Sequence, residues 1–268
     1  MKDFLRQLLS GVENQILARQ VMREYLQALL LQSLQDRGAF SAWLFQGGTV
    51  LRFLYSMPRF SEDLDFALIK PGAEDNFEEN LDNAKKAFLA VNYEISLKLK
   101  VMKTVKSAFV RFRGLLYEFG LSPLESETVS IKVEVDTNPP LGAGTDSTVV
   151  RRHIILNLRH YDKASLLAGK LHAVMTRGYV KGRDVYDLIW YLSDRSWPSP
   201  NIELLQNALR QTDWAGPEVT AQNWRSLVCQ RIDEFNWERV LEDVQPFLER
   251  PDDIALVTKE NALRLLAE

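Results

Sequence analysis

The spacing of apolar residues predicts alternating helices and strands in the first part of the chain. Apolar positions three or four residues apart, as on one face of a helix, are found at 14–35, 49–55 and 77–91. Short apolar runs that end in turn-forming residues, as buried strands do, are found at 42–45 and 63–69.

From residue 93 the apolar period changes to two. Ile95 and Leu97 alternate with Ser96 and Lys98, which is typical of a strand with one buried face. The same reasoning predicts further strands at 107–116, 128–136 and 149–156.

Strand patterning ends at about Asp162, and helical spacing fills the rest of the chain. Helices are predicted at 163–176, 183–192, 202–210, 223–235 and 237–248. The fold class is therefore α+β, with a mixed α/β sheet and flanking helices followed by an all-helical C-terminal region. We expect two domains, residues 1–160 and 161–268.

Composition narrows the classes of function. The 268 residues are 46% apolar and 26% charged, as in a globular protein, and the net charge of −3 argues against a globally basic nucleic-acid binder. One cysteine excludes an intrachain disulfide, and the three histidines are scattered, so a metal ion would need carboxylate ligands. Without a secretory signal or an apolar run of about 18 residues, a cytoplasmic protein with no membrane partner is expected.

Asp63 and Asp65 form the first candidate for chemistry. They lie two residues apart on a predicted strand, so both carboxylates leave the same face. Two neighbouring carboxylates repel each other unless a cation lies between them, and Mg²⁺ prefers such hard oxygen ligands. Taken alone, an Asp-x-Asp pair is more often two solvated acids at a strand edge.

The residues before this pair favour a nucleotide. Gly47 and Gly48 permit close backbone approach, and the helix that begins near Thr49 offers N–H groups to a phosphate. Arg59 and Ser61 supply a positive charge and a hydroxyl that can hold a triphosphate. The order turn, helix, arginine, serine and paired acids indicates metal and nucleotide binding more strongly than any one feature does.

The signature of the AbiEii/AbiGii toxin family is similar to two stretches here, Gly47-Gly48-Thr49 and Arg59-Phe60-Ser61-Glu62-Asp63-Leu64-Asp65-Phe66. This family is a branch of the polymerase-β-like nucleotidyltransferases, and its founding members are toxins of abortive-infection toxin–antitoxin pairs. The resemblance covers about residues 44–192 and implies a nucleotidyltransferase-type sheet, an NTP substrate and a type IV system with a cognate antitoxin encoded nearby.

A two-metal mechanism needs a third acid on a neighbouring strand. The predicted strand at 128–136 carries two candidates on one face, Glu134 and Asp136, and the less favoured alternative is that both are solvent-facing residues without a role in binding. The resemblance favours Glu134 and so implies that Asp63, Asp65 and Glu134 hold the metals. Asp136, close to Pro139, is also suited to a turn at the end of the strand.

A second motif opens the helical half. Lys170 and Arg177 lie on one helical face with the small Ala173 between them, which leaves room for both cations to bind a phosphate chain. Asp184 begins the next helix, where an acid is electrostatically favoured. By itself this pattern is commonplace, but it resembles the second motif of the same family. The resemblance implies that Lys170 contacts the nucleotide phosphates and that Asp184 is essential for activity. Asp187 is expected to pair with Arg183, four residues earlier.

The implied reaction is attack by an acceptor hydroxyl on the α-phosphate of an NTP, with release of pyrophosphate. Basic residues on and near the third predicted strand suggest an RNA acceptor, and by analogy with the family tRNA is favoured: Lys98, Lys100, Lys103, Lys106, Arg111 and Arg113. A solubilising strand edge explains these residues equally well. Nucleotidylation of a protein or small molecule, and a non-catalytic nucleotide-binding regulator, are the other functions considered.

Overall fold

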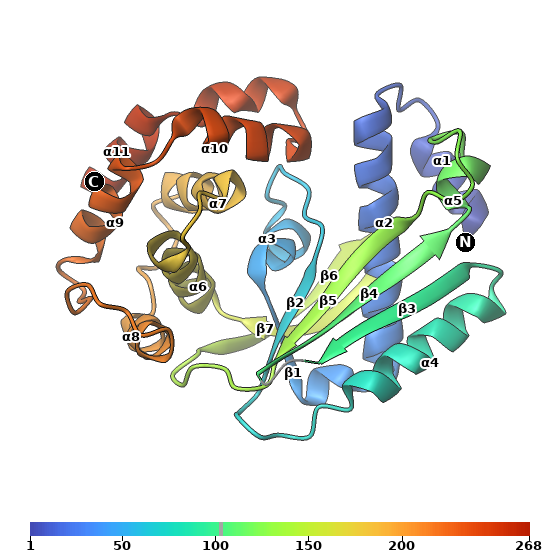
Figure 1. Ribbon diagram of the computed structural model, residues 1–268, viewed down its shortest axis with the longest axis horizontal. Coiled ribbons are helices and arrows are strands. Elements are labelled where there is room, and N and C mark those ends of the chain that lie inside the picture. The colour runs from blue at the N-terminus through green and yellow to red at the C-terminus, as the bar shows by residue number, and fades with distance from the viewer. Residues whose placement is uncertain (102–103) are drawn as a thin grey trace. The chain divides into compact units, whose positions relative to one another are not determined.

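The computed structural model describes residues 1–101 and 104–268. Within these residues, seven strands form one mixed sheet in the order β3-β4-β5-β2-β1-β7-β6 (Figure 1). The strands are β1 (Trp43–Gln46), β2 (Leu64–Leu68), β3 (Glu94–Val101), β4 (Val105–Arg113), β5 (Val129–Asp136), β6 (Thr145–Arg152) and β7 (Ile154–Tyr161).

The chain divides into two compact units. The first contains residues 1–55, 60–139 and 147–160, and the second contains 56–59, 140–146 and 161–268. The first unit holds most of the sheet and the second holds the C-terminal helices. The expected domain boundary at residue 160 remains a prediction.

The helices of the first unit are α1 (Lys2–Leu9), α2 (Gln15–Asp36), α3 (Gly47–Tyr55), α4 (Phe77–Ala90) and α5 (Leu115–Glu118), with a 3-10 turn, η1 (Ala39–Ser41). Asn14 begins α2, because its side chain accepts hydrogen bonds from the N–H groups of Ile16 and Leu17. Helix α2 packs against α4 and β5, and α4 packs against β3. The apolar faces predicted from the sequence therefore form the core beneath the sheet.

The second unit is helical apart from its short β-strand ends. Its elements are α6 (Lys163–Thr176), α7 (Gly182–Ser193), α8 (Ile202–Gln211), α9 (Trp224–Asp233), α10 (Trp237–Val244), η2 (Gln245–Phe247), η3 (Pro251–Leu256) and α11 (Lys259–Ala267). Helix α6 packs against α7, α8 and α9, and α7 packs against α10 and α11. The mixed sheet with flanking helices and the helical C-terminal region confirm the expected fold class.

Two strand predictions need correction. The single strand expected at 149–156 is in fact two strands, β6 and β7, joined at His153, which has a φ of 63°. The strand expected at 107–116 ends at Arg113, because Gly114 turns the chain with a φ of 69° and α5 follows.

None of the helices among the described residues combines the length and the apolar character that a membrane span requires.

Candidate active site

The first unit brings the three predicted acids to one face of the sheet. Strands β2 and β5 are parallel neighbours, and their register pairs Asp65 with Glu134. Asp63 comes one residue before β2, two positions from Asp65, and therefore lies on the same side of the chain. All three side chains are half-buried. The sheet thus gathers carboxylates that are about 70 residues apart in sequence.

Gly47 lies directly against one of these carboxylates. Its φ is +80°, and a Cβ atom at this position would lie 2.5 Å from Oδ2 of Asp65. Only glycine meets both conditions without strain. Since Gly47 begins α3, the Asp65 carboxylate lies at the positive end of that helix, where a negative charge is stabilised.

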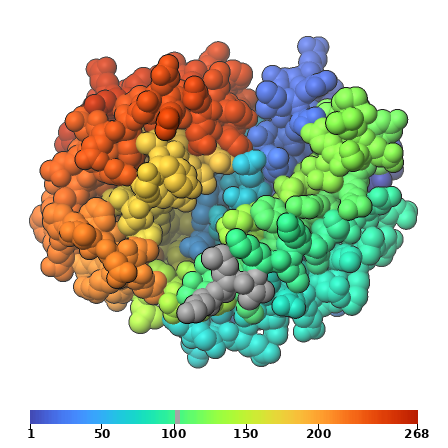
Figure 2. All heavy atoms as spheres, in the orientation of Figure 1, coloured from blue at the N-terminus to red at the C-terminus, as the bar shows by residue number. Residues whose placement is uncertain are grey.

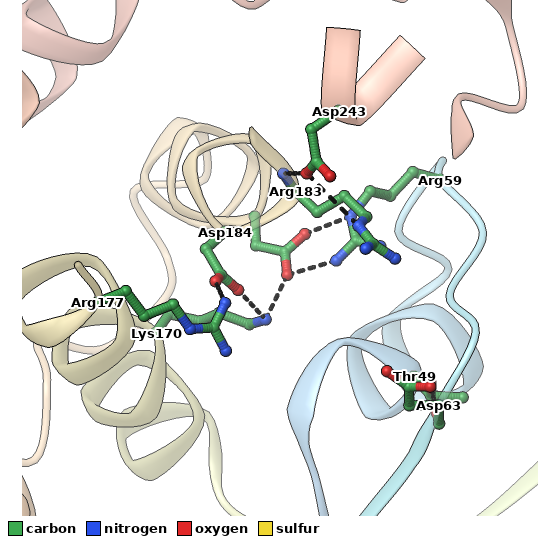
Figure 3. A network of polar contacts seen from close by, with 9 residues as sticks. Thr49, Arg59, Asp63, Lys170, Arg177, Arg183, Asp184 and Asp243 are labelled. Carbon is green, nitrogen blue, oxygen red and sulfur yellow. Dashed lines mark hydrogen bonds and ion pairs between the residues drawn. The ribbon is translucent and has the colours of Figure 1, made fainter. Parts of the chain in front are cut away.

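Thr49 holds the loop that carries the other aspartate. Its side chain is fully buried, and its hydroxyl donates a hydrogen bond to the carbonyl oxygen of Asp63 (Figure 3). On the same loop, the carbonyl of Ser61 accepts a hydrogen bond from Nε2 of Gln27 at 3.0 Å. Helices α2 and α3 therefore fix the backbone between Ser61 and Asp63. Direct nucleotide contacts by Gly47, Gly48, Thr49 and Ser61 remain predictions.

Lys132 is a further residue of this site, and the sequence motifs do not include it. Its Nζ lies 2.7 Å from Oε2 of Glu134, two residues along β5. Burial alone would lower the pKa of Lys132, but the hydrogen bond and charge of Glu134, together with the charges of Asp63 and Asp65, raise it. The ammonium group therefore remains charged beside the three acids. The signal was available in the alternation of β5, where Lys132 and Glu134 share a face.

The acid surface, formed by Asp63, Asp65 and Glu134, has donors that suit Mg²⁺. Over residues 1–101 and 104–268, no three histidine, cysteine or carboxylate side chains are arranged closely enough to hold a metal ion. Hard carboxylate oxygens on one face are nevertheless the ligand type that Mg²⁺ prefers. The acids also raise the pKa of Lys132, which shows that this surface stabilises a positive charge. The donor set therefore fits the metal.

Asp136, the other candidate for the third acid, lies at the end of β5. Its Oδ1 accepts a hydrogen bond from the N–H of Asn138 at 2.9 Å, in the turn that follows the strand. Burial raises the pKa of its carboxyl group. In the register, Asp136 pairs with Ala67, two residues further along each strand than the Asp65–Glu134 pair. The geometry therefore favours Glu134 as the partner of the aspartates.

The second unit contains a buried network of charges, which we call the helical charge network: Arg59, Lys170, Arg177, Asp184 and Asp187. Asp187 is its centre, with a side chain that is 0% exposed. Nε of Arg59 lies 2.6 Å from Oδ1 of Asp187, and Nζ of Lys170 lies 2.6 Å from Oδ2. Both cations are thereby held in one orientation.

Asp184 extends the network by one helical turn. It accepts hydrogen bonds from Lys170 at 3.0 Å and from Arg177 (Figure 3). Burial alone would raise the pKa of Asp184, but the positive charges of Lys170, Arg177 and Lys181 lower it to about 2. The Lys170 pKa is raised, since Asp187 and Asp184 outweigh the opposing effect of burial.

This network revises the expected role of Asp187. The sequence suggested a pair between Asp187 and Arg183, whereas Asp187 binds Arg59 and Lys170. Arg183 instead has its N–H and its guanidinium directed to Asp243 of α10 (Figure 3). Arg59 was expected to act beside Ser61, but its guanidinium is engaged by Asp187. Local sequence spacing gave no signal for a partner 128 residues away.

Part of the expected basic surface shares the face of the acids. The register pairs Lys100 with Ser107, and Ser107 with Glu134, so these three side chains leave the same side of the sheet. Lys98 and Arg111 lie on this side by alternation along β3 and β4. Strands β3 and β4 contribute to the green surface drawn in Figure 2.

The remaining basic residues differ in their placement. Arg113 lies on the same face by alternation, and we call Lys98, Lys100, Arg111 and Arg113 the basic strip. Lys106 lies on the opposite face, where its Nζ is 2.8 Å from the Asp75 carboxylate, so it does not belong to the strip. Lys103, which was also predicted to contribute, is outside the described residues.

Comparison with known proteins agrees with this fold. A sequence model described as nucleotidyl transferase AbiEii toxin, type IV TA system, matches residues 29–259. A candidate nucleotidyltransferase from H. pylori has a TM-score of 0.53 and 18% identity, over 89% of this chain and 92% of that chain. JHP933 from Helicobacter pylori has a TM-score of 0.53 and 18% identity, over 92% of each chain. No curated protein matches in sequence. The expected nucleotidyltransferase-type fold is confirmed.

Proposed function

Because the chain belongs to the AbiEii nucleotidyl transferase toxin family, we propose that it transfers a nucleoside monophosphate from an NTP to RNA, with Mg²⁺. It would act as the toxin of a type IV system and have a cognate antitoxin as partner. The observation that carries the proposal is the register of β2 and β5, which sets Asp65 beside Glu134 with Asp63 two residues away. A sheet with three acids on one face is suited to two-metal nucleotidyl transfer.

Asp63, Asp65 and Glu134 are the residues that would hold the metal. Bound there, Mg²⁺ would neutralise charge on the attacking and leaving oxygens. An acceptor hydroxyl would form a bond to the α-phosphorus, the bond to the pyrophosphate oxygen would break so that pyrophosphate leaves, and the hydroxyl proton would pass to solvent water. Gly47 keeps the Asp65 carboxylate at the start of α3, and Thr49 keeps Asp63 in place.

The helical charge network supports nucleotide binding for a separate reason. It contains three cations, Arg59, Lys170 and Arg177, and two carboxylates, Asp184 and Asp187, so its net charge is positive. We propose that Lys170 and Arg177 contact the nucleotide phosphates, that Asp184 orients both, and that Arg59, buried against Asp187, adds positive charge without touching the phosphates. Cations held by buried acids need little reordering when a phosphate binds.

An RNA acceptor is supported by the basic strip. Lys98, Lys100, Arg111 and Arg113 lie on the face of the sheet that also carries the acids. A few such contacts with backbone phosphates give salt-dependent RNA binding without a basic protein. Among RNAs, tRNA is the acceptor that we test first, and that choice rests on family resemblance alone.

The proposal is tested by incubating the protein with each α-labelled NTP, Mg²⁺ and total RNA, and then measuring labelled RNA and released pyrophosphate. We expect transfer of label to RNA, and its loss in Asp63→Asn, Asp65→Asn and Glu134→Gln. Asp136→Asn is the matched control, because it removes a carboxylate from the same strand face and should retain activity.

The alternatives give different results in the same assay. Label on protein or on a small metabolite would identify another acceptor. Binding of Mg²⁺-NTP without pyrophosphate release from any acceptor would indicate a regulator. For the biological role, expression of the wild type should arrest growth and the Asp63→Ala, Asp65→Ala double variant should not. Arrest by the double variant would show that nucleotidyl transfer is not the toxic activity.

A further inference from the structure

Lys132 occupies an unusual position for a lysine. It lies on the face of β5 opposite to the buried Ile131 and Val133, yet its side chain is only 31% exposed. A charged ammonium group loses hydration at such a position and needs compensation from nearby negative charge. Glu134 provides it directly, with Nζ and Oε2 2.7 Å apart.

The sheet register places the other acids on the same side. Strand β2 runs parallel to β5 and pairs Leu64 with Val133 and Asp65 with Glu134, so one step back along both strands sets Asp63 beside Lys132. The charges of Asp63 and Asp65 act on Lys132 together with that of Glu134. Lys132 therefore contacts one of the acids proposed to hold Mg²⁺, Glu134, and lies on the same face as the other two.

The Glu134 oxygen that Lys132 engages, Oε2, is a weaker ligand for a metal ion while the ammonium group neutralises its charge. While Lys132 binds Glu134, that carboxylate is directed along its own strand, toward Lys132. A metal ion that takes Oε2 as a ligand would have to displace the Lys132 ammonium group from it.

We propose that Lys132 is a positioning residue that serves as the counter-ion of the acid surface before the metal binds and competes with the metal for Glu134. This inference rests on the proposed function, since it assumes that Asp63, Asp65 and Glu134 are the metal ligands. Lys132 thereby keeps the acids together without metal and sets the metal concentration at which the site fills.

The competition can be measured without any enzyme assay. Mn²⁺, a paramagnetic substitute for Mg²⁺, is titrated into wild type and Lys132→Met, and free ion is followed by electron paramagnetic resonance. Methionine keeps the apolar stem but not the charge. We expect the variant to bind Mn²⁺ more tightly by roughly fivefold, the change expected for removal of a partly exposed ion pair. Lys132→Arg, which keeps the charge, should bind as the wild type does.

Controls separate this inference from the proposed function. Lys106 lies on the neighbouring strand, β4, and is paired with Asp75. Lys106→Met should leave Mn²⁺ affinity unchanged. In a Glu134→Gln background, Lys132→Met should have little further effect. Lys132→Gln gives a second neutral variant if the methionine variant fails to fold.

Each outcome decides one of the two claims. Unchanged or weaker Mn²⁺ binding by folded Lys132→Met and Lys132→Gln overturns the role of Lys132. If Asp65→Asn weakens Mn²⁺ binding in the same series, the metal site itself stands. If Asp65→Asn leaves Mn²⁺ binding unchanged, the proposed metal site is wrong, whatever Lys132 does.

Discussion

At the scale of single residues, Gly47 is the position where substitution most directly disturbs the acids. Gly47→Ala should place a methyl group against the Asp65 carboxylate and add the cost of a left-handed backbone, about 1–2 kcal/mol. We expect nucleotidyl transfer to be lost. Gly38→Ala is the control, because Gly38 also has a positive φ, +74°, but no atom lies within 4 Å of its added carbon. Equal activity in the two variants would contradict the proposed contact.

Asp187 is the residue on which the helical charge network depends. Asp187→Asn should reduce the free energy of unfolding by about 3–5 kcal/mol, because Arg59 and Lys170 would be left buried without their shared carboxylate. Denaturant unfolding measures this loss. Asp82→Asn removes an exposed partner of Lys86 and should leave the unfolding midpoint as it is. A similar small effect at Asp187 would mean that the network contributes little to folding.

The residue scale also shows what the sequence could predict about the site. Asp63 and Asp65 could be proposed because strand alternation and the Gly-Gly turn are local patterns, whereas alternation left Glu134 and Asp136 open and the family resemblance chose Glu134. The partner of Arg59 could not, since Asp187 is 128 residues away and reaches it only through tertiary packing. Lys132 shares the alternation of Glu134, but a lysine on a strand usually indicates a solvent-facing position.

At the scale of elements, most helices and strands follow from apolar spacing. The prediction of a helix at 163–176 matches α6 (Lys163–Thr176), since apolar residues mark its buried face throughout. The segment at 145–161 was harder, because β6 has no buried residue and so lacks an apolar alternation. Helices α1 and α11 were missed, since each is short and mostly exposed.

Glu24 links three elements of the first unit through one buried carboxylate. It lies 2.5 Å from Arg52 of α3, 3.2 Å from Arg152 of β6 and 3.0 Å from His153 in the turn that follows. Burial alone would raise the pKa of Glu24. The hydrogen bond with His153 and the charges of Arg52 and Arg152 instead lower it from 4.5 to about 2.

A pH dependence of stability follows from Glu24. Its folded-state pKa is below the unfolded value of 4.5, so its contribution is complete above pH 4.5 and is lost as the pH falls toward 2. That contribution is roughly 3 kcal/mol. Urea unfolding over this pH range should show a flatter decline in Glu24→Gln than in wild type. Part of the decline should remain in Glu24→Gln, because the pKa of Asp184 is also lowered to about 2 and its contribution to stability is lost over the same pH range. Parallel profiles would exclude this role of Glu24.

Gly182 allows α7 and α10 to approach closely. A Cβ atom at this position would overlap the carbonyl oxygen of Val240, a backbone atom that cannot move aside cheaply. Gly182→Ala should lower the free energy of unfolding by about 1–3 kcal/mol. Gly169→Ala, in α6 with nothing within 4 Å, should instead raise it by about 0.5–1 kcal/mol, because alanine favours a helix. Thermal unfolding of both variants compares the two effects.

At the scale of the whole molecule, the family match extends further than the motifs. The resemblance was visible over residues 44–192, whereas the family model covers 29–259. The added part includes the C-terminal helices, whose sequence shows amphipathic spacing but no distinctive polar motif. Such spacing predicts a helix and cannot distinguish one family from another, because many helices share it.

Because the net charge is −3, RNA binding would depend on a local cluster of positive charge and not on the total charge of the protein. If the basic strip contacts RNA, the Lys98→Ala, Lys100→Ala double variant should bind RNA more weakly. The slope of log affinity against log salt should fall by about 0.7–0.9 per lost phosphate contact.

The Lys85→Ala, Lys86→Ala double variant on α4 provides the control. Like the strip variant, it lowers the net charge from −3 to −5, but it does so outside the strip. It should keep the wild-type slope, because lysines on a helix outside the strip do not replace counter-ions at the bound phosphates. If both double variants weaken binding equally, RNA responds only to overall charge, and the face that carries the acids is not where the acceptor binds.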